Sequence, residues 1–135
     1  ICASRPVIDL IVNRARSLIY STGMSPADAG AALAGLEIIT EDRDLTARPL
    51  ANARRFTKLM DLPEATSPIV PLLLGDAETA LRHSAKLEEA GFLVTAIRPP
   101  TVPEGTARLR FTFTAGHEED QIRGLADALR AEGIS

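Results

Sequence analysis

The sequence TAIRPPTVPEGTARLRFTFT, residues 95–114, decides how this chain folds. Its second part, from Arg108 to Thr114, alternates polar and apolar residues, which is typical of a strand with one buried face. Its first residues end an apolar run from Phe92 to Ile97, which we predict to be another strand. Between these strands, residues 98–105 include three prolines. Because proline has no backbone N–H to donate, we predict that this segment is a loop.

Outward from this segment, the apolar run IVPLLL at residues 69–74 predicts a third, mostly buried strand, in which Pro71 favours an edge position or a bulge. Apolar periodicity and capping residues predict helices around these strands. They are expected at residues 5–20, 26–39, 47–60 and 77–90, with a last helix capped within residues 114–119 and ending near Ala131. The predicted fold class is α+β: a small, three-stranded, mainly antiparallel sheet with helices on one face, preceded by further helices.

Composition excludes several classes of protein. Hydrophobic residues make up 45% of the 135 residues and charged residues 24%, which fits one globular domain and excludes a disordered tail. The net charge is −3 and the charges are mixed along the chain, so we expect no nucleic-acid partner. The apolar runs are far shorter than the roughly 20 residues that span a bilayer, so we expect no membrane segment.

The start of the chain carries two further expectations. A single cysteine, Cys2, cannot form an internal disulfide, which favours a reducing, cytoplasmic compartment and a buried, inert thiol. The first residue, Ile1, is not a methionine, and the chain begins in the middle of an apolar pattern. We interpret the chain as a piece of a longer polypeptide.

Few residues have the spacing of a known catalytic or metal-binding motif. His83 and His117 are far apart in the sequence and neither has a second ligand at metal-binding spacing, so no metal site is predicted. His117 is expected in the first turn of the last helix, as a capping residue. Arg98, Arg108 and Arg110 could be solvated charges or could form a carboxylate site, because a guanidinium offers a planar fork to both carboxylate oxygens. Their spacing alone does not decide between these alternatives.

Two stretches together resemble a known family. VTAIRPPTVPEGTARLRFTFTAGHEEDQI (residues 94–122) and VNRARSLIYSTGMSPA (residues 12–27) closely resemble the α-oxoamine synthases, which are fold-type I enzymes dependent on pyridoxal 5′-phosphate. The resemblance runs over essentially all of the chain. The IRPPTVPxGTARLR run is similar to the branch of the family that uses a pimeloyl substrate.

The resemblance implies an acyltransferase of biotin biosynthesis that condenses L-alanine with pimeloyl-CoA, or a pimeloyl carrier protein, and releases CO₂. It implies a cytoplasmic homodimer with its active site at the subunit interface. Residues 1–42 are then expected to be the end of the large domain with its connecting helices. Residues 43–135 are expected to form the small C-terminal α+β domain.

The resemblance also implies roles for individual residues. Arg110 matches the arginine that binds the amino-acid carboxylate, and Arg98 matches a second arginine at the same carboxylate or near the acyl substrate. Thr22, together with Ser21, matches the element that reaches the cofactor phosphate of the neighbouring subunit. The family usually reads S-T-A-L-P-P there, whereas this chain reads S-T-G-M-S-P, and Gly23 adds backbone freedom to that turn. By contrast, Arg108 is expected to matter mainly for packing and local charge.

The family's catalytic lysine lies in a Ser/Thr-x-x-Lys-x-x-Gly stretch that the resemblance places upstream of this sequence. Neither Lys58 nor Lys86 matches it, so we expect no catalytic residue in this chain. Three alternatives stay open: another α-oxoamine synthase, similar to glycine C-acetyltransferase; a non-catalytic, carboxylate-binding regulatory module; and a purely structural dimerisation domain. An in-frame upstream lysine motif would exclude the regulatory module.

The lysine argument gives a first prediction. The 135-residue chain alone, mixed with pyridoxal 5′-phosphate, should develop no visible Schiff-base absorbance, because it has no matching lysine. Absorbance spectroscopy followed by borohydride reduction and peptide mapping measures this. A stoichiometric reduced adduct at Lys58 or Lys86 would contradict it.

Overall fold

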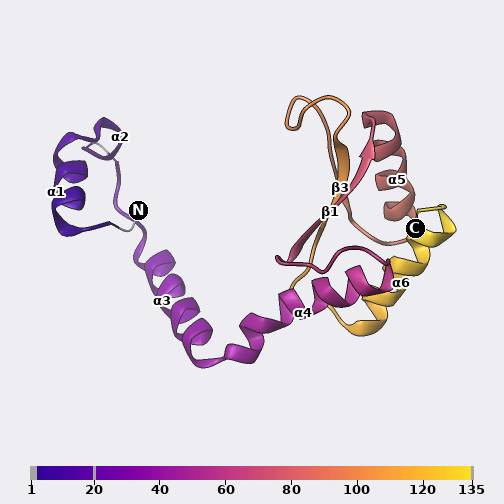
Figure 1. Cartoon of the computed structure of the whole chain (residues 1–135). Helices are drawn as coiled ribbons and strands as arrows, with labels where there is room; N and C mark the ends of the chain where they lie inside the picture. The colour runs from indigo at the N-terminus through magenta and orange to yellow at the C-terminus, as the bar shows by residue number, and fades with distance from the viewer. Residues whose placement is uncertain (1–2, 20, 135) are drawn as a thin grey trace. The chain divides into compact units, whose positions relative to one another are not determined.

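The computed structural model describes residues 3–19 and 21–134, and the chain divides into two compact units. The first unit runs to Glu41 and the second begins at Asp42. Figure 1 shows the elements, which are, in chain order, α1 (Arg5–Arg14), α2 (Arg16–Ile19), α3 (Pro26–Glu41), α4 (Arg43–Leu59), β1 (Ile69–Gly75), α5 (Ala77–Glu89), β2 (Thr95–Ile97), β3 (Ala107–Thr112) and α6 (Glu119–Ala131).

The second unit is built on a three-stranded sheet in the order β1-β3-β2. Both outer strands run antiparallel to β3, so that Pro71 of β1 and Thr95 of β2 lie on either side of Arg110. The predicted α+β class with an antiparallel sheet is confirmed. Pro71 lies on an edge strand as predicted, and the pairing of β1 shifts register between Leu73 and Gly75.

The alternation of β3 separates a buried face from an open one. Ala107, Leu109 and Phe111 are buried, whereas Arg108 is half-buried and Arg110 is exposed. Helices α4, α5 and α6 pack on the buried face (Figure 1). Rings pack against rings there, with Phe56 of α4 at 4.8 Å from Phe111 and 5.1 Å from Phe113 between centroids. The core is completed by Ala53, Met60, Leu87, Ile122, Leu125 and Leu129, among others.

Two predicted strands are longer than the observed ones, because other elements use their backbone groups. Residues 92–94 were predicted as strand, but the N–H of Phe92 donates to the carbonyl of Leu87, and the carbonyl of Val94 accepts from the hydroxyl of Ser84. This part of the chain therefore completes the end of α5 instead of pairing in the sheet. Likewise, the N–H of Thr114 donates to the Nδ1 atom of His117, and β3 ends at Thr112.

Three helix predictions also need correction. The predicted helix over residues 5–20 is two helices, because Ala15 has an extended backbone (φ −76°, ψ 104°) that ends α1. Helix α4 begins at Arg43, four residues before the predicted start, because Asp42 accepts a hydrogen bond from the N–H of Leu45. His117 precedes α6 and is not in its first turn, because the cap is Glu118 with Gln121.

Cys2, for which we predict a buried thiol, and Tyr20 lie outside the described residues. Over the ranges that the structure covers, no helix is both long enough and apolar enough to cross a membrane.

The cap of α5 makes stability depend on pH. Asp76 accepts hydrogen bonds from the backbone N–H and the side chain of Thr79, and these bonds lower the pKa of its carboxyl below the ordinary value of 3.8. A lowered pKa means that the contribution to stability is fully present above the unfolded-state pKa and is lost as the pH falls through the folded-state pKa. At pH 7, Asp76→Ala should therefore unfold at a lower temperature than wild type, and this difference should shrink below about pH 4.

Asp76→Asn is the matched control, since Asn caps nearly as well as Asp but does not titrate. Thermal unfolding followed by circular dichroism between pH 2.5 and pH 7 measures all three proteins. A difference between Asp76→Ala and wild type that stays constant over this range would contradict the role of the charge.

Candidate functional site

The open face of the sheet presents two arginines side by side along β3. Arg108 lies between Leu73 and Ile97 of the outer strands, and Arg110 lies between Pro71 and Thr95. Directly paired residues of an antiparallel sheet point to the same face, so the cross-strand neighbours of both arginines are apolar or neutral. No carboxylate is among these neighbours.

The two arginines differ in their partners. The Nε atom of Arg108 donates a hydrogen bond of 2.9 Å to the carbonyl of Thr106. Within residues 3–19 and 21–134, no hydrogen bond or ion pair engages the side chain of Arg110. Arg110 therefore combines a rigid backbone at the centre of a sheet with an uncompensated, exposed guanidinium. This combination suits a group that binds an external anion.

Arg98 begins the loop after β2 and is exposed. The only described hydrogen bond of its side chain is a long one, 3.4 Å from Nη1 to the carbonyl of its neighbour Pro99. Thr95, opposite Arg110, precedes Arg98 by three residues, which corresponds to roughly 10 Å along a strand. The structure thus brings Arg98, Arg108 and Arg110 into one hairpin, with two of them on one face and the third at the start of its loop.

Ser21 and Thr22 belong to the other compact unit. They lie in the non-helical segment between α2 and α3, and both are exposed. Their hydroxyl groups are the kind of donor that binds phosphate oxygens.

The lysines and histidines are otherwise engaged or exposed. Lys58 is exposed on α4, and Lys86 of α5 forms an ion pair with Glu132. His83 is mostly buried, with its Nδ1 atom 3.8 Å from the same carboxylate. Among the described residues, no group of three or more potential ligands is placed to hold a metal ion.

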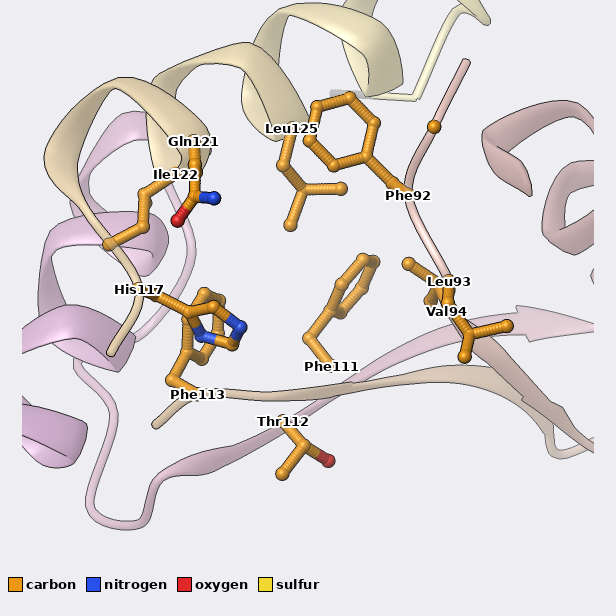
Figure 2. Close-up of a pocket in the computed structure, with 11 residues that line it drawn as sticks. Phe92, Leu93, Val94, Phe111, Thr112, Phe113, His117, Gln121, Ile122 and Leu125 are labelled. Carbon is orange, nitrogen blue, oxygen red and sulfur yellow. The ribbon is translucent and has the colours of Figure 1, made fainter. Parts of the chain in front are cut away.

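A pocket of about 270 Å³ opens on the opposite, helix-covered side of β3. Figure 2 shows Phe111 and Phe113 pointing into it, Thr112 pointing away from it, and His117 and Gln121 at one end. Neither Arg98 nor Arg110 lines it. The sequence did not predict this pocket, which is lined by residues 92–94 between the end of α5 and the start of β2. Gly91 (φ +89°), which ends α5, was the available signal that the next residues serve the helix.

Comparison with known proteins identifies the family of this hairpin and the rest of the chain. The model of the family "Aminotransferase class I and II" matches residues 1–129. The chain belongs to the aminotransferase class I and II family. The expectation of a family resemblance along nearly the whole chain is thereby confirmed.

Several aminotransferase class I and II relatives are named 8-amino-7-oxononanoate synthase. That of Methylocella silvestris is 61% identical over 96% of this chain and 37% of its own length, and that of Methylorubrum extorquens is 60% identical over 96% and 34%. This chain therefore spans about a third of the length of these relatives.

Solved structures of this family share the fold. 8-Amino-7-oxononanoate synthase from Francisella tularensis is 29% identical, with a TM-score of 0.77 over 98% of this chain and 42% of its own. Serine palmitoyltransferase from Sphingomonas wittichii, at 24% identity, has a TM-score of 0.86 over 98% and 36%. A serine palmitoyltransferase structure from S. paucimobilis, which contains bound PLP and myriocin, is 25% identical with a TM-score of 0.81 over 98% and 36%. The predicted membership of the fold-type I class is confirmed by these neighbours.

Proposed function

We propose that this chain is the C-terminal part of an enzyme that condenses L-alanine with a pimeloyl thioester, releases CO₂ and forms 8-amino-7-oxononanoate. The observation that carries the proposal is Arg110: an exposed guanidinium without a described partner, held on the central strand of the sheet. Relatives near 60% identity bear the name of this enzyme, which supports the same reading.

The cofactor of the proposed enzyme is pyridoxal 5′-phosphate. When bound, it supplies the electron sink for bonds broken at the amino-acid Cα. Each unit offers groups that fit this chemistry: Thr22 and Ser21 of the first unit offer hydroxyls suited to the cofactor phosphate of the neighbouring subunit, and Arg110 of the second unit offers a fork suited to the substrate carboxylate. They do not offer the lysine, because Lys58 is exposed on a helix and Lys86 is paired with Glu132. We propose that this lysine belongs to the part of the enzyme outside this chain.

Arg110 acts by holding the substrate carboxylate in one orientation. Two parallel N–H···O bonds fix the plane of the carboxylate as well as its position, which a single point charge does not. The bond to be broken at the substrate Cα therefore points in one direction. The entropic cost of orienting it is met when the substrate binds and does not add to the barrier of the reaction. Arg98 is the second cation at this carboxylate or at the acyl substrate. Its place at the start of a proline-containing loop limits how far it can move.

The first unit fits the proposed role of residues 1–42 as the end of a large domain and its connecting helices. Apart from Asp28, Glu37 and Glu41, helix α3 is mostly apolar and its apolar residues are not confined to one side; Leu33, Leu36 and Ile39 are each more than half exposed. A helix that is apolar all round is normally buried in the complete protein. We propose that the remainder of the enzyme covers it, that the enzyme is a homodimer with its site at the subunit interface, and that it acts in the cytoplasm.

The activity is tested with the full-length gene product loaded with pyridoxal phosphate. We expect L-alanine and pimeloyl-CoA to give CO₂, free CoA and 8-amino-7-oxononanoate, measured by thiol release and mass spectrometry. Turnover with glycine and acetyl-CoA instead would favour the alternative synthase. Carboxylate binding without turnover of either pair would favour the regulatory module.

Arg110 gives the site-directed prediction. In the full-length enzyme, Arg110→Ala should weaken L-alanine binding by roughly 10- to 150-fold, the range expected for loss of a charge-assisted hydrogen bond, and should leave cofactor affinity almost unchanged. Arg110→Lys should recover part of this loss, because an ammonium keeps the charge but not the fork. Spectral titration of the bound cofactor with L-alanine measures each variant.

Arg108→Ala is the control on the same face of the same strand, and it should weaken alanine binding much less. If Arg110→Ala stays within twofold of wild type while Arg108→Ala does not, the carboxylate site is assigned to the wrong arginine. If only Arg98→Ala weakens alanine binding, the carboxylate site lies at the loop that begins with Arg98.

A further inference from the structure

The loop between β2 and β3, residues 98–106, contains two separate hydrogen-bonded turns, of which the second is also bonded to Arg108 of β3. We call it the proline loop. It consists of two successive turns: the N–H of Thr101 donates to the carbonyl of Arg98 over 3.1 Å, and the N–H of Thr106 donates to the carbonyl of Pro103 over 3.2 Å. In the second turn, Gly105 has φ +74°, the left-handed conformation that the third position of a type II turn requires.

Thr106 closes the second turn twice. Besides its N–H, its hydroxyl donates to the same carbonyl of Pro103 over 2.7 Å. A carbonyl oxygen has two lone pairs, so both bonds can form together. Removing the hydroxyl would leave the turn with a single closing bond at the point where the loop re-enters the sheet.

Arg108 connects this turn to the sheet. Its Nε atom donates to the carbonyl of Thr106 over 2.9 Å, and its own backbone is paired between Leu73 and Ile97. The hydrogen bonds therefore run from the central strand through Arg108 to Thr106, and from Thr106 to Pro103. This accounts for the difference between the two arginines of the open face, since Arg108 is half-buried and bonded within the loop while Arg110 is exposed.

Arg98, at the other end of the loop, has no comparable support for its side chain. Its only described side-chain bond reaches the adjacent Pro99, so its position depends on the backbone on its two sides, which are the end of β2 and the proline loop. A loop of this length is longer than the usual two- to five-residue hairpin connection, and its ordering would otherwise cost free energy when a substrate binds.

We propose that Thr106 and Arg108 are positioning residues that hold the proline loop and thereby set where Arg98 stands relative to Arg110. This inference rests on the proposed function, in which Arg98 meets a substrate. It assigns to Arg108 a role beyond packing and local charge, exerted through the loop and not by direct contact with the amino-acid carboxylate.

The test uses Thr106 variants of the full-length enzyme. Thr106→Val removes the hydroxyl but keeps the branched shape, and Thr106→Ser restores a hydroxyl. We expect Thr106→Val to change the same substrate parameter that Arg98→Ala changes, the KM of one substrate, by about 3- to 10-fold, the range for one neutral hydrogen bond. Thr106→Ser should return it to within twofold of wild type. Steady-state kinetics with L-alanine and with the pimeloyl thioester varied in turn supplies both values.

A double-mutant cycle separates positioning from general damage. If Thr106 acts through Arg98, Thr106→Val should have no further effect on that KM in the Arg98→Ala background. Effects that simply multiply would overturn the proposal, and so would an Arg98→Ala variant with unchanged kinetics. Wild-type turnover tests the proposed function separately, because it does not depend on either substitution.

Hydrogen exchange gives a second readout that does not depend on activity. In Thr106→Val and in Arg108→Ala, the amides of residues 101–107 should exchange faster than in wild type, while those of α5 and α6 stay unchanged. Peptide-resolved exchange measured by mass spectrometry reports this difference. Unchanged exchange in the loop would overturn the proposal even in a fully active enzyme.

Discussion

The structure depends on one constraint: β3 is paired along both edges, so its side chains have only two directions to take. The buried direction collects Leu109 and Phe111 against the rings and aliphatic groups of α4, α5 and α6. Arg108 and Arg110 therefore lie on the open face, because a one-residue slip of register would bury both charges and expose the core residues. The stability of the core and the placement of the arginines are therefore consequences of the same pairing.

The open face shows how neighbouring residues of one type can acquire different tasks. Arg108 and Arg110 share a strand, a face and similar neighbours, but of the two only Arg108 has a described hydrogen bond to a carbonyl of the adjoining loop. A guanidinium bonded to backbone is a structural cross-link, whereas an exposed one on a rigid strand keeps all its donors for a ligand. The proposed carboxylate site and the proposed loop support follow from this single difference in reach.

At two ends of strands, local hydrogen bonds replace pairing between strands. Residues 92–94 have the composition of a strand, but their backbone groups serve the end of α5, and β2 is left with three residues. Thr114 similarly gives its N–H to His117. In both places, a nearby acceptor or donor on the adjoining helix or turn outcompetes strand pairing, because the entropic cost of closing a short segment is low. The pocket beside Phe111 lies where β2 fails to extend.

The sequence by itself determined the class of fold, the restriction of Pro71 to an edge strand or a bulge, and the two faces of β3, because alternation and proline chemistry are local properties. It also carried the family, through the motifs around Arg98 and Arg110. It did not determine where β2 begins, where β3 ends or where α4 begins, since those boundaries depend on which group satisfies each N–H and carbonyl in the folded chain. Only the tertiary structure decided that Arg108 is bonded to Thr106 while Arg110 is left without a described partner, because that outcome depends on how the loop folds back onto the strand. A pattern of residue types specifies which face a side chain takes, but the partners it meets there are set by the three-dimensional path of the rest of the chain.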